Sequence, residues 1–215
     1  GMSASSSWDE WRVNADKHSP ADQFQYSLNA DASDVFVVMV IGESARSGNF
    51  GLLGYERPTT PLLATTKNLI AFNGTSCNTS TKLSLQCMFV RPSAVIDHGL
   101  QAPEVREDTV FSVFRKLGFT SELFAMQSEV WFYNSLKPNH YKIREVIAAD
   151  DANRNQPVLD SFLETELNSS VAKHAKGRHI VVLHTKGSHF NYTSRYPREF
   201  AKYQPECEGV AGACS

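Results

Sequence analysis

The sequence predicts an α/β fold with a mostly parallel sheet flanked by helices. Residues 34–41 form a run that is continuously apolar and largely β-branched after Asp34, and residues 179–184 form a second such run with a histidine at each end. Apolar runs without alternation are typical of strands that are buried on both faces, as in parallel sheets. Segments with helical spacing of apolar residues lie between the runs, and this alternation indicates an α/β domain.

Two helices and one further strand are predicted between those runs. Apolar residues recur at helical spacing over residues 109–117, and Gly118 follows at the position of a C-cap. Residues 119–126, which follow this C-cap, are then predicted to form the next strand. A second helical stripe covers residues 157–171, and we expect Pro157 to open that helix, because proline is favoured in the first helical turn.

Length and composition indicate an ordinary globular chain. It has 215 residues, of which 41% are hydrophobic and 20% charged, with a formal net charge of −2. This balance argues against a nucleic-acid-binding protein, which usually carries an excess of basic residues. The longest apolar run is far shorter than the roughly 18 residues that cross a bilayer. We interpret residues 1–33 as a polar leader or linker that begins with a cloning remnant, and residues 34–215 as the folded part.

The four cysteines, Cys77, Cys87, Cys207 and Cys214, fall into two local pairs. Two short-loop disulfides or one four-thiolate zinc site would both use this set. Structural zinc sites usually contain closely spaced Cys-x-x-Cys pairs, which the sequence lacks. The spacing therefore favours disulfides, and disulfides indicate an oxidising compartment such as the periplasm.

Polar side chains follow both predicted buried strands. Glu43 comes directly after the run 34–41, and the cluster Thr-Lys-Gly-Ser-His at 185–189 comes after the run 179–184. Open α/β sheets bind their ligands at the carboxyl ends of the strands, so both segments are candidates for a site. The alternative for Glu43 is an unremarkable position at the start of a helix, with its side chain facing solvent.

Three segments carry a resemblance to a known family. They are Ile-Gly-Glu-Ser-Ala-Arg at 41–46, the cysteine-flanked Asn-Thr-Ser-Thr-Lys at 78–82, and His-Thr-Lys-Gly-Ser-His-Phe at 184–190. In this order they resemble the phosphoethanolamine transferases of Gram-negative bacteria, which include the lipid A transferases and the mobile colistin-resistance enzymes. Their fold is related to alkaline phosphatases and sulfatases. The sequences of residues 83–90 and 124–129 are most similar to the branch of the family that acts on the Kdo sugar of lipopolysaccharide.

The resemblance implies specific roles. Glu43 is expected to bind zinc, and Thr81 to be both the nucleophile and a metal ligand. His189 is expected to line the site and contact the substrate or a second zinc ion, so that one or two zinc ions are implied. Metal coordination would activate the poorly nucleophilic threonine hydroxyl, and a predicted helix over residues 83–89 would present amide donors to a phosphoryl group there. The alternatives are a capping cluster at 79–81 and a surface histidine at 189.

The resemblance also bears on the cysteines and on His184. Family members carry a disulfide that matches Cys77 and Cys87, around the nucleophile, and one that matches Cys207 and Cys214. His184, at the end of its strand, is expected to be structural.

The zinc site that the resemblance implies is incomplete in this sequence. The family takes its remaining ligands from an Asp-His-Gly-Glu-Ser motif far downstream, and we interpret the Asp-His-Gly at 97–99 as a coincidence. We therefore expect the chain to stop before the true motif, with residues 34–215 forming the N-terminal portion of a periplasmic catalytic domain. It then supplies two of the expected ligands, Glu43 and Thr81, whereas a catalytic zinc normally has three protein ligands.

The implied function is transfer of phosphoethanolamine from phosphatidylethanolamine to lipopolysaccharide, on Kdo or lipid A, through a phosphoethanolamine-threonine intermediate. The enzyme would act at the periplasmic face of the inner membrane and be held there by a transmembrane region outside this sequence. Its product would make the bacterial surface less anionic. Cationic peptides such as polymyxin would then bind that surface more weakly. The alternatives are a metal-dependent hydrolase of the phosphatase or sulfatase type, and an inert fragment.

Overall fold

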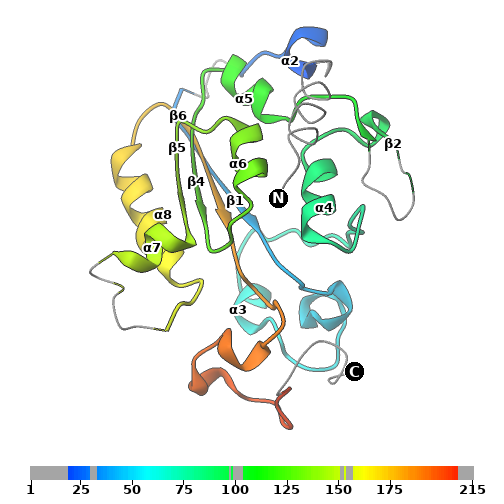
Figure 1. Cartoon of the computed structure of the whole chain (residues 1–215), viewed down its shortest axis with the longest axis vertical. Helices are drawn as coiled ribbons and strands as arrows, with labels where there is room; N and C mark the ends of the chain where they lie inside the picture. The colour runs from blue at the N-terminus through cyan, green and yellow to red at the C-terminus, as the bar shows by residue number, and fades with distance from the viewer. Residues whose placement is uncertain are drawn as a thin grey trace, which may run out of the picture.

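The computed structural model describes residues 19–29, 33–96, 98, 104–150, 153 and 157–207. Its centre is a parallel four-stranded sheet in the order β1-β6-β4-β5 (Figure 1). The four strands are β1 (Val35–Ile41), β4 (Thr120–Ala125), β5 (His140–Ile143) and β6 (Arg178–His184). A separate antiparallel pair is formed by β2 (Val95–Ile96) and β3 (Glu104–Val105). The predicted fold class, a mostly parallel sheet flanked by helices, is confirmed.

Short helices occupy the connections between the strands. The α-helices are α2 (Pro20–Gln23), α3 (Pro61–Ala64), α4 (Thr81–Met88), α5 (Phe111–Lys116), α6 (Val130–Leu136), α7 (Arg144–Ala149) and α8 (Phe162–Lys173). Single turns of 3₁₀ helix cover Ser47–Asn49, Gly51–Leu53, Pro92–Ala94, Tyr192–Ser194 and Arg198–Phe200.

Two hydrophobic cores lie on opposite faces of the sheet. On one face, side chains of α4, α5 and α6, such as Leu85, Phe111 and Phe132, pack against Leu123 and Ile180. On the other face, α7 and α8 pack against the alternate side chains of β4 and β6; the buried members there are Phe124, Met126, Ile147, Phe162, Leu163, Val181 and Leu183. The two central strands are therefore covered on both sides, as the apolar sequence of β6 predicts.

The prediction that the strand at 34–41 is buried on both faces is wrong for the described part of the chain. β1 lies at the edge of the sheet, and only its odd-numbered residues pack against the first core. Val38 and Val40 point to the other face and are 45% and 61% exposed. The helix expected to open at Pro157 was also placed too early, because α8 begins at Phe162.

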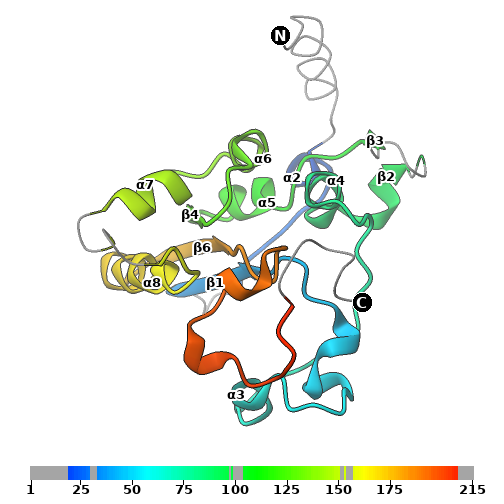
Figure 2. The ribbon, with the colours of Figure 1, turned by 60° about the horizontal axis from the view of Figure 1, so that its bottom comes forward.

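The four strands of the parallel sheet point toward one end of the molecule, and the segments that follow β1 and β6 extend beyond that end. In Figures 1 and 2, the segment after β1 and the segment after β6 run beside each other beyond the sheet. A contact between them is the guanidinium of Arg57, which lies 5.2 Å from the ring centre of Tyr203. Among the described helices, none is long and apolar enough to cross a membrane.

Candidate active site

Three neighbouring strands bring their carboxyl ends to one place. Ile41 of β1 and Ala125 of β4 are both aligned with His184 of β6, so the three strands end level with one another. Glu43 and Gln127 each stand two residues beyond the end of a strand, and the loop at 185–189 follows the third. The parallel sheet thus gathers side chains that are far apart in the sequence.

Thr81 reaches the same place from α4. Its hydroxyl Oγ1 donates a hydrogen bond to Oε2 of Glu43 over 2.7 Å. α4 begins at Thr81, two residues earlier than the predicted helix, so Thr81 occupies the first turn, where backbone amides have no partner within the helix. The disulfide between Cys77 and Cys87, with Cα atoms 6.6 Å apart, closes the loop that contains Thr81. The structure therefore brings together the two residues on which the sequence interpretation depends.

Glu43 is buried and its carboxylate accepts several hydrogen bonds. Glu43 is 9% exposed, so the alternative in which its side chain faces solvent is wrong. Ser44 Oγ donates to Oε1 over 2.7 Å, and Gln127 Nε2 donates to Oε2 over 3.0 Å. Burial alone would raise the pKa of Glu43. The hydrogen bonds from Gln127, Ser44 and Thr81, with the nearby His189 ring, outweigh burial and hold that pKa below its ordinary value. Glu43 is therefore a carboxylate at neutral pH.

Gln127 is a residue of the site that the sequence reasoning missed. Its buried side-chain amide donates to the Thr185 carbonyl as well as to Glu43, both over 3.0 Å, and lies 3.2 Å from Nε2 of His184. It therefore connects the loops that follow β4, β1 and β6. The signal for it was its position, because Gln127 follows its strand at the same distance as Glu43 follows β1.

His184 is structural in this arrangement, as predicted. It is fully buried, and its Nδ1 lies 2.9 Å from the hydroxyl of Tyr133. Burial lowers its pKa, although nearby carboxylates oppose that effect, so the imidazole is neutral at pH 7. Tyr133 and Gln127 together fix the orientation of this ring behind Glu43.

The loop that carries His189 is held tightly against Glu43. The carboxylate of Asp160 accepts hydrogen bonds from the backbone amides of Lys186 and Gly187, over 2.6 and 2.8 Å. Gly187 has φ +49°, and a Cβ atom at this position would lie 2.7 Å from the Glu43 carbonyl oxygen. Only glycine therefore allows this approach. Nδ1 of His189 is buried without a hydrogen-bond partner, so it is available to a ligand.

The donor set fits part of a zinc site. The carboxylate of Glu43 and the hydroxyl of Thr81 face each other. His189 adds a ring nitrogen without a hydrogen-bond partner, and its ring is close enough to lower the pKa of Glu43. Oxygen and imidazole nitrogen are both common zinc ligands. The ligand roles of these three residues remain predictions.

Other sequence expectations fall partly outside the described residues. Cys207 is disulfide-bonded, but its expected partner Cys214 lies outside them. In the Asp-His-Gly segment, Asp97 and Gly99 also lie outside. His98 is half-exposed, with Nε2 3.6 Å from Oε2 of Glu104 on β3.

The chain matches known proteins over this same region. A protein-family model described as Sulfatase matches residues 36–212. Over all 215 residues, the chain is 46% identical to the Kdo(2)-lipid A phosphoethanolamine 7''-transferase of Escherichia coli K12, and it spans 38% of the length of that relative.

Solved structures agree with the fold. The integral membrane protein lipooligosaccharide phosphoethanolamine transferase A from Neisseria meningitidis superposes with a TM-score of 0.71 at 27% identity, covering 94% of this chain and 38% of the other. The C-terminal periplasmic domain of EptC from Escherichia coli, solved in complex with zinc, superposes with a TM-score of 0.63 at 21% identity. That match covers 86% of this chain and 52% of the other, and it supports the fold alone.

Proposed function

The chain belongs to the sulfatase family, and from this premise we propose that it forms part of a transferase that moves phosphoethanolamine from phosphatidylethanolamine to lipopolysaccharide. The observation that carries the proposal is the 2.7 Å hydrogen bond between Thr81 Oγ1 and Glu43 Oε2. It joins a hydroxyl nucleophile to a buried carboxylate at the end of the sheet where α/β proteins bind ligands. Relatives of this chain carry the same activity in their names.

Thr81 is the nucleophile in this proposal. Its oxygen forms a bond to the phosphorus of phosphatidylethanolamine, and the phosphorus–oxygen bond to diacylglycerol breaks. Diacylglycerol leaves with the proton that Thr81 gives up, and phosphoethanolamine remains esterified to Thr81. A hydroxyl or phosphate oxygen of lipopolysaccharide then attacks the same phosphorus, and the proton that it releases restores the Thr81 hydroxyl.

The surroundings of Thr81 suit this chemistry. The first-turn amides of α4 lie beside the hydroxyl and can donate hydrogen bonds to phosphoryl oxygens. The disulfide to Cys87 restricts the loop that leads into the helix, and the hydrogen bond to Glu43 orients the hydroxyl. Positioning and electrostatic stabilisation of this kind account for most catalysis of phosphoryl transfer.

Zinc is the cofactor that we propose for this site, with Glu43 and Thr81 as ligands and His189 toward the substrate or a second ion. A bound zinc ion would supply Lewis acidity, which lowers the pKa of a coordinated hydroxyl and offsets negative charge on the phosphoryl group. Glu43 suits a cation because it is buried and ionised, and because neutral groups donate its hydrogen bonds.

The location and acceptor follow from the relatives. We propose that the whole protein lies at the periplasmic face of the inner membrane, because the relative from Neisseria meningitidis at 27% identity is an integral membrane protein. Kdo is the acceptor that we favour, since the relative at 46% identity is a Kdo(2)-lipid A transferase. The cysteines in disulfides agree with an oxidising compartment.

A covalent adduct tests the proposal. The full-length protein that contains this chain is incubated with phosphatidylethanolamine, and its peptides are analysed by mass spectrometry. We expect phosphoethanolamine on the peptide that contains Thr81, and we expect added lipopolysaccharide to remove it and become modified. Release of free phosphoethanolamine without modified lipopolysaccharide would instead identify a hydrolase. An adduct on another residue would refute the role of Thr81.

A further inference from the structure

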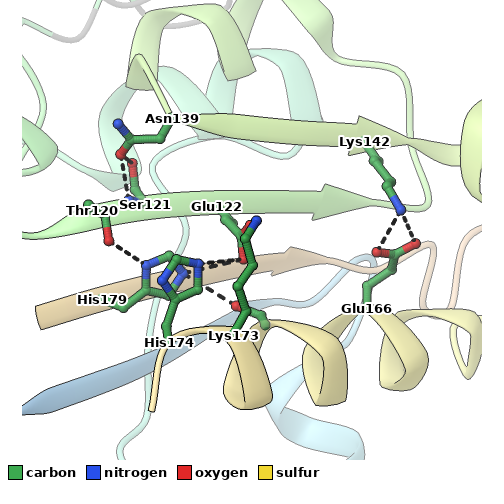
Figure 3. Close-up of polar contacts among 10 residues, drawn as sticks. Thr120, Ser121, Glu122, Asn139, Lys142, Glu166, Lys173, His174 and His179 are labelled. Carbon is green, nitrogen blue, oxygen red and sulfur yellow. Dashed lines mark hydrogen bonds and ion pairs between the residues drawn. The ribbon is translucent and has the colours of Figure 1, made fainter. Parts of the chain in front are cut away.

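A second cluster of metal-ligating side chains lies at the opposite end of the sheet (Figure 3). It consists of Glu122 on β4, His174 directly after α8, and His179 on β6. One ligand atom from each residue lies within 4.8 Å of the other two. Glu122 and His179 stand near the amino ends of their strands, whereas Glu43 and Thr81 lie beyond the carboxyl ends, so the two groups are separate.

We propose that Glu122, His174 and His179 form a zinc site that joins the end of α8 to β4 and β6. This inference does not rest on the proposed transferase function. It rests on the burial and spacing of these three side chains, and on one atom of Glu122 and one of His174 that are buried without a hydrogen-bond partner.

The first argument is that the cluster contains buried polar atoms without hydrogen bonds. Glu122 is 4% exposed and His179 is 1% exposed. Oε2 of Glu122 and Nε2 of His174 are both buried, and neither has a hydrogen-bond partner. An unsatisfied buried polar atom destabilises the folded state, so two of them converging on one point need an explanation. A bound cation explains both.

The second argument is the spacing of the ligand atoms. Nε2 of His174 lies 3.5 Å from Oε2 of Glu122, and Nε2 of His179 lies 3.4 Å from the same oxygen. In a tetrahedral zinc site with bonds of about 2.0–2.1 Å, neighbouring ligand atoms are roughly 3.3–3.4 Å apart. Two of the three separations therefore already match those of a zinc coordination sphere.

The third argument is the hydrogen bonding of His179. Its Nδ1 lies 2.7 Å from Oγ1 of Thr120, and the Thr120 hydroxyl can donate to the carbonyl of Arg178. With the hydroxyl donating in that direction, Nδ1 carries the proton and donates to Thr120, which leaves Nε2 as a lone pair facing Glu122. Metal-binding histidines are typically fixed in this way by a partner at their other nitrogen.

One rearrangement is required. The rings of His174 and His179 are stacked, with centroids 3.6 Å apart and planes 5° apart. A metal ion lies near the plane of each imidazole that binds it, so the rings must open. His174 can turn, because it lies just past the last helical residue and its side chain is 22% exposed. His179 is fixed in the strand.

The cluster has access to water and a means of adjusting its charge. Glu122, Ser170 and Lys173 line a small polar cavity of about 120 Å³, which gives water access to the Glu122 carboxylate. Lys173 contacts the other carboxylate oxygen, Oε1, over 3.1 Å, and its side chain is 63% exposed. It can therefore move into solvent when a divalent cation binds. Ser170 Oγ, 3.3 Å from His179 Nε2, can turn its hydroxyl to the Glu122 carboxylate.

Zinc binding measured in the absence of the other site tests the proposal. The chain carrying Glu43→Gln, which removes the expected ligand of the candidate active site, is stripped with chelator and titrated with Zn²⁺ against a chromophoric competitor. We expect one bound zinc ion per chain. Adding His174→Ala should weaken binding by more than about a hundredfold, because one of three protein ligands is lost. Adding His98→Ala, a half-exposed histidine elsewhere, should leave binding unchanged.

Two further measurements keep the test decisive. Glu122→Gln retains the shape of the side chain and should also abolish tight binding, so it replaces His174→Ala if that variant fails to fold. Zinc should raise the thermal midpoint of the Glu43→Gln chain but of neither cluster variant. If the Glu43→Gln chain binds no zinc, or if it binds zinc equally with and without the cluster residues, the proposal is wrong.

Discussion

Two buried glutamates at opposite ends of the sheet show how differently a carboxylate can be accommodated. Glu43 accepts hydrogen bonds from three neutral groups, the side chains of Ser44, Thr81 and Gln127. Glu122, by contrast, is paired through one oxygen with the ammonium of Lys173, while its other oxygen has no hydrogen-bond partner. The first arrangement fixes an ionised carboxylate in a defined orientation, and the second leaves a buried oxygen that a further cation would satisfy.

The comparison suggests two kinds of metal site. Neutral donors around Glu43 hold its charge without cancelling it, so a cation there can act on a substrate at the open end of the sheet. At Glu122 the ligands come from two strands and the end of α8, and Glu122 and His179 are buried, which suits a cation that stabilises the fold. Function would then depend on the first glutamate and stability on the second.

Removing the Thr81 hydroxyl should produce the largest effect. We expect Thr81→Ala in the full-length protein to lower transfer to lipopolysaccharide by at least about a thousandfold, because the nucleophile is lost. Thr81→Ser keeps a hydroxyl and should retain measurable transfer. Transfer is measured with labelled phosphatidylethanolamine in membranes. The matched control is Thr79→Ala, an exposed threonine in the same loop, which should behave as the unmodified protein.

Near-normal transfer by Thr81→Ala would contradict the assignment of the nucleophile. The 2.7 Å hydrogen bond between Thr81 and Glu43 would then serve only to hold the start of α4, in agreement with the capping alternative.

Changing Gln127 should have the next largest effect. Gln127→Met keeps the approximate length of the side chain but removes the amide that donates to Glu43 and to the Thr185 carbonyl. Loss of such a supporting hydrogen bond typically costs about 10–100-fold in activity or metal affinity, and we expect a loss of kcat in this range. Gln86→Met, a half-buried position on α4, is the matched control and should leave kcat unchanged.

If Gln127→Met keeps full kcat, Glu43 is held well enough by Ser44 and Thr81 alone. The contrast between a fixed and an incompletely satisfied glutamate would then be weaker than the hydrogen bonds indicate.

Sequence reasoning predicted the elements that are determined locally. The strands β1 and β6 follow from their apolar runs, and β4 was predicted as the strand after a helix that Gly118 ends, where Gly118 adopts φ +80°. The disulfide between Cys77 and Cys87 was implied by family resemblance and is present. The meeting of Glu43 and Thr81, 38 residues apart, was foreseen through the same resemblance and not from spacing.

What sequence reasoning missed depends on long-range arrangement. An apolar run cannot reveal that β1 lies at the edge of the sheet with Val38 and Val40 exposed, because edge and centre are set by the order of pairing. The cluster at the other end was missed for the same reason. Glu122 and His179 are 57 residues apart in the sequence (179 − 122). They meet only because their strands, β4 and β6, pair in register.

The smallest expected effect concerns the pH dependence of stability at the candidate active site. Burial lowers the pKa of His184, although Glu43, Glu129 and Asp160 oppose that effect. The unfolded chain therefore binds a proton near pH 6.5 that the folded chain does not yet bind. The stability from the neutral ring is complete above that pH and is lost as pH falls toward the lower pKa of the folded state. The slope that one such group contributes is at most about 1.4 kcal/mol per pH unit.

Urea unfolding of the chain at pH 7, 6 and 5, with chelator present, measures this slope. We expect His184→Gln to flatten the fall in the free energy of unfolding, whereas His98→Gln, at a half-exposed position, should leave it unchanged. Part of the fall should persist in His184→Gln, because burial also lowers the pKa of His179 at the other end of the sheet. Adding zinc in place of chelator should raise the free energy of unfolding and steepen its remaining fall with decreasing pH if the cluster binds metal, because a bound ion keeps the proton off His179 in the folded chain while the unfolded chain still binds it. An unaltered slope in His184→Gln would mean that the ring is already protonated, or reached by water, in the folded chain.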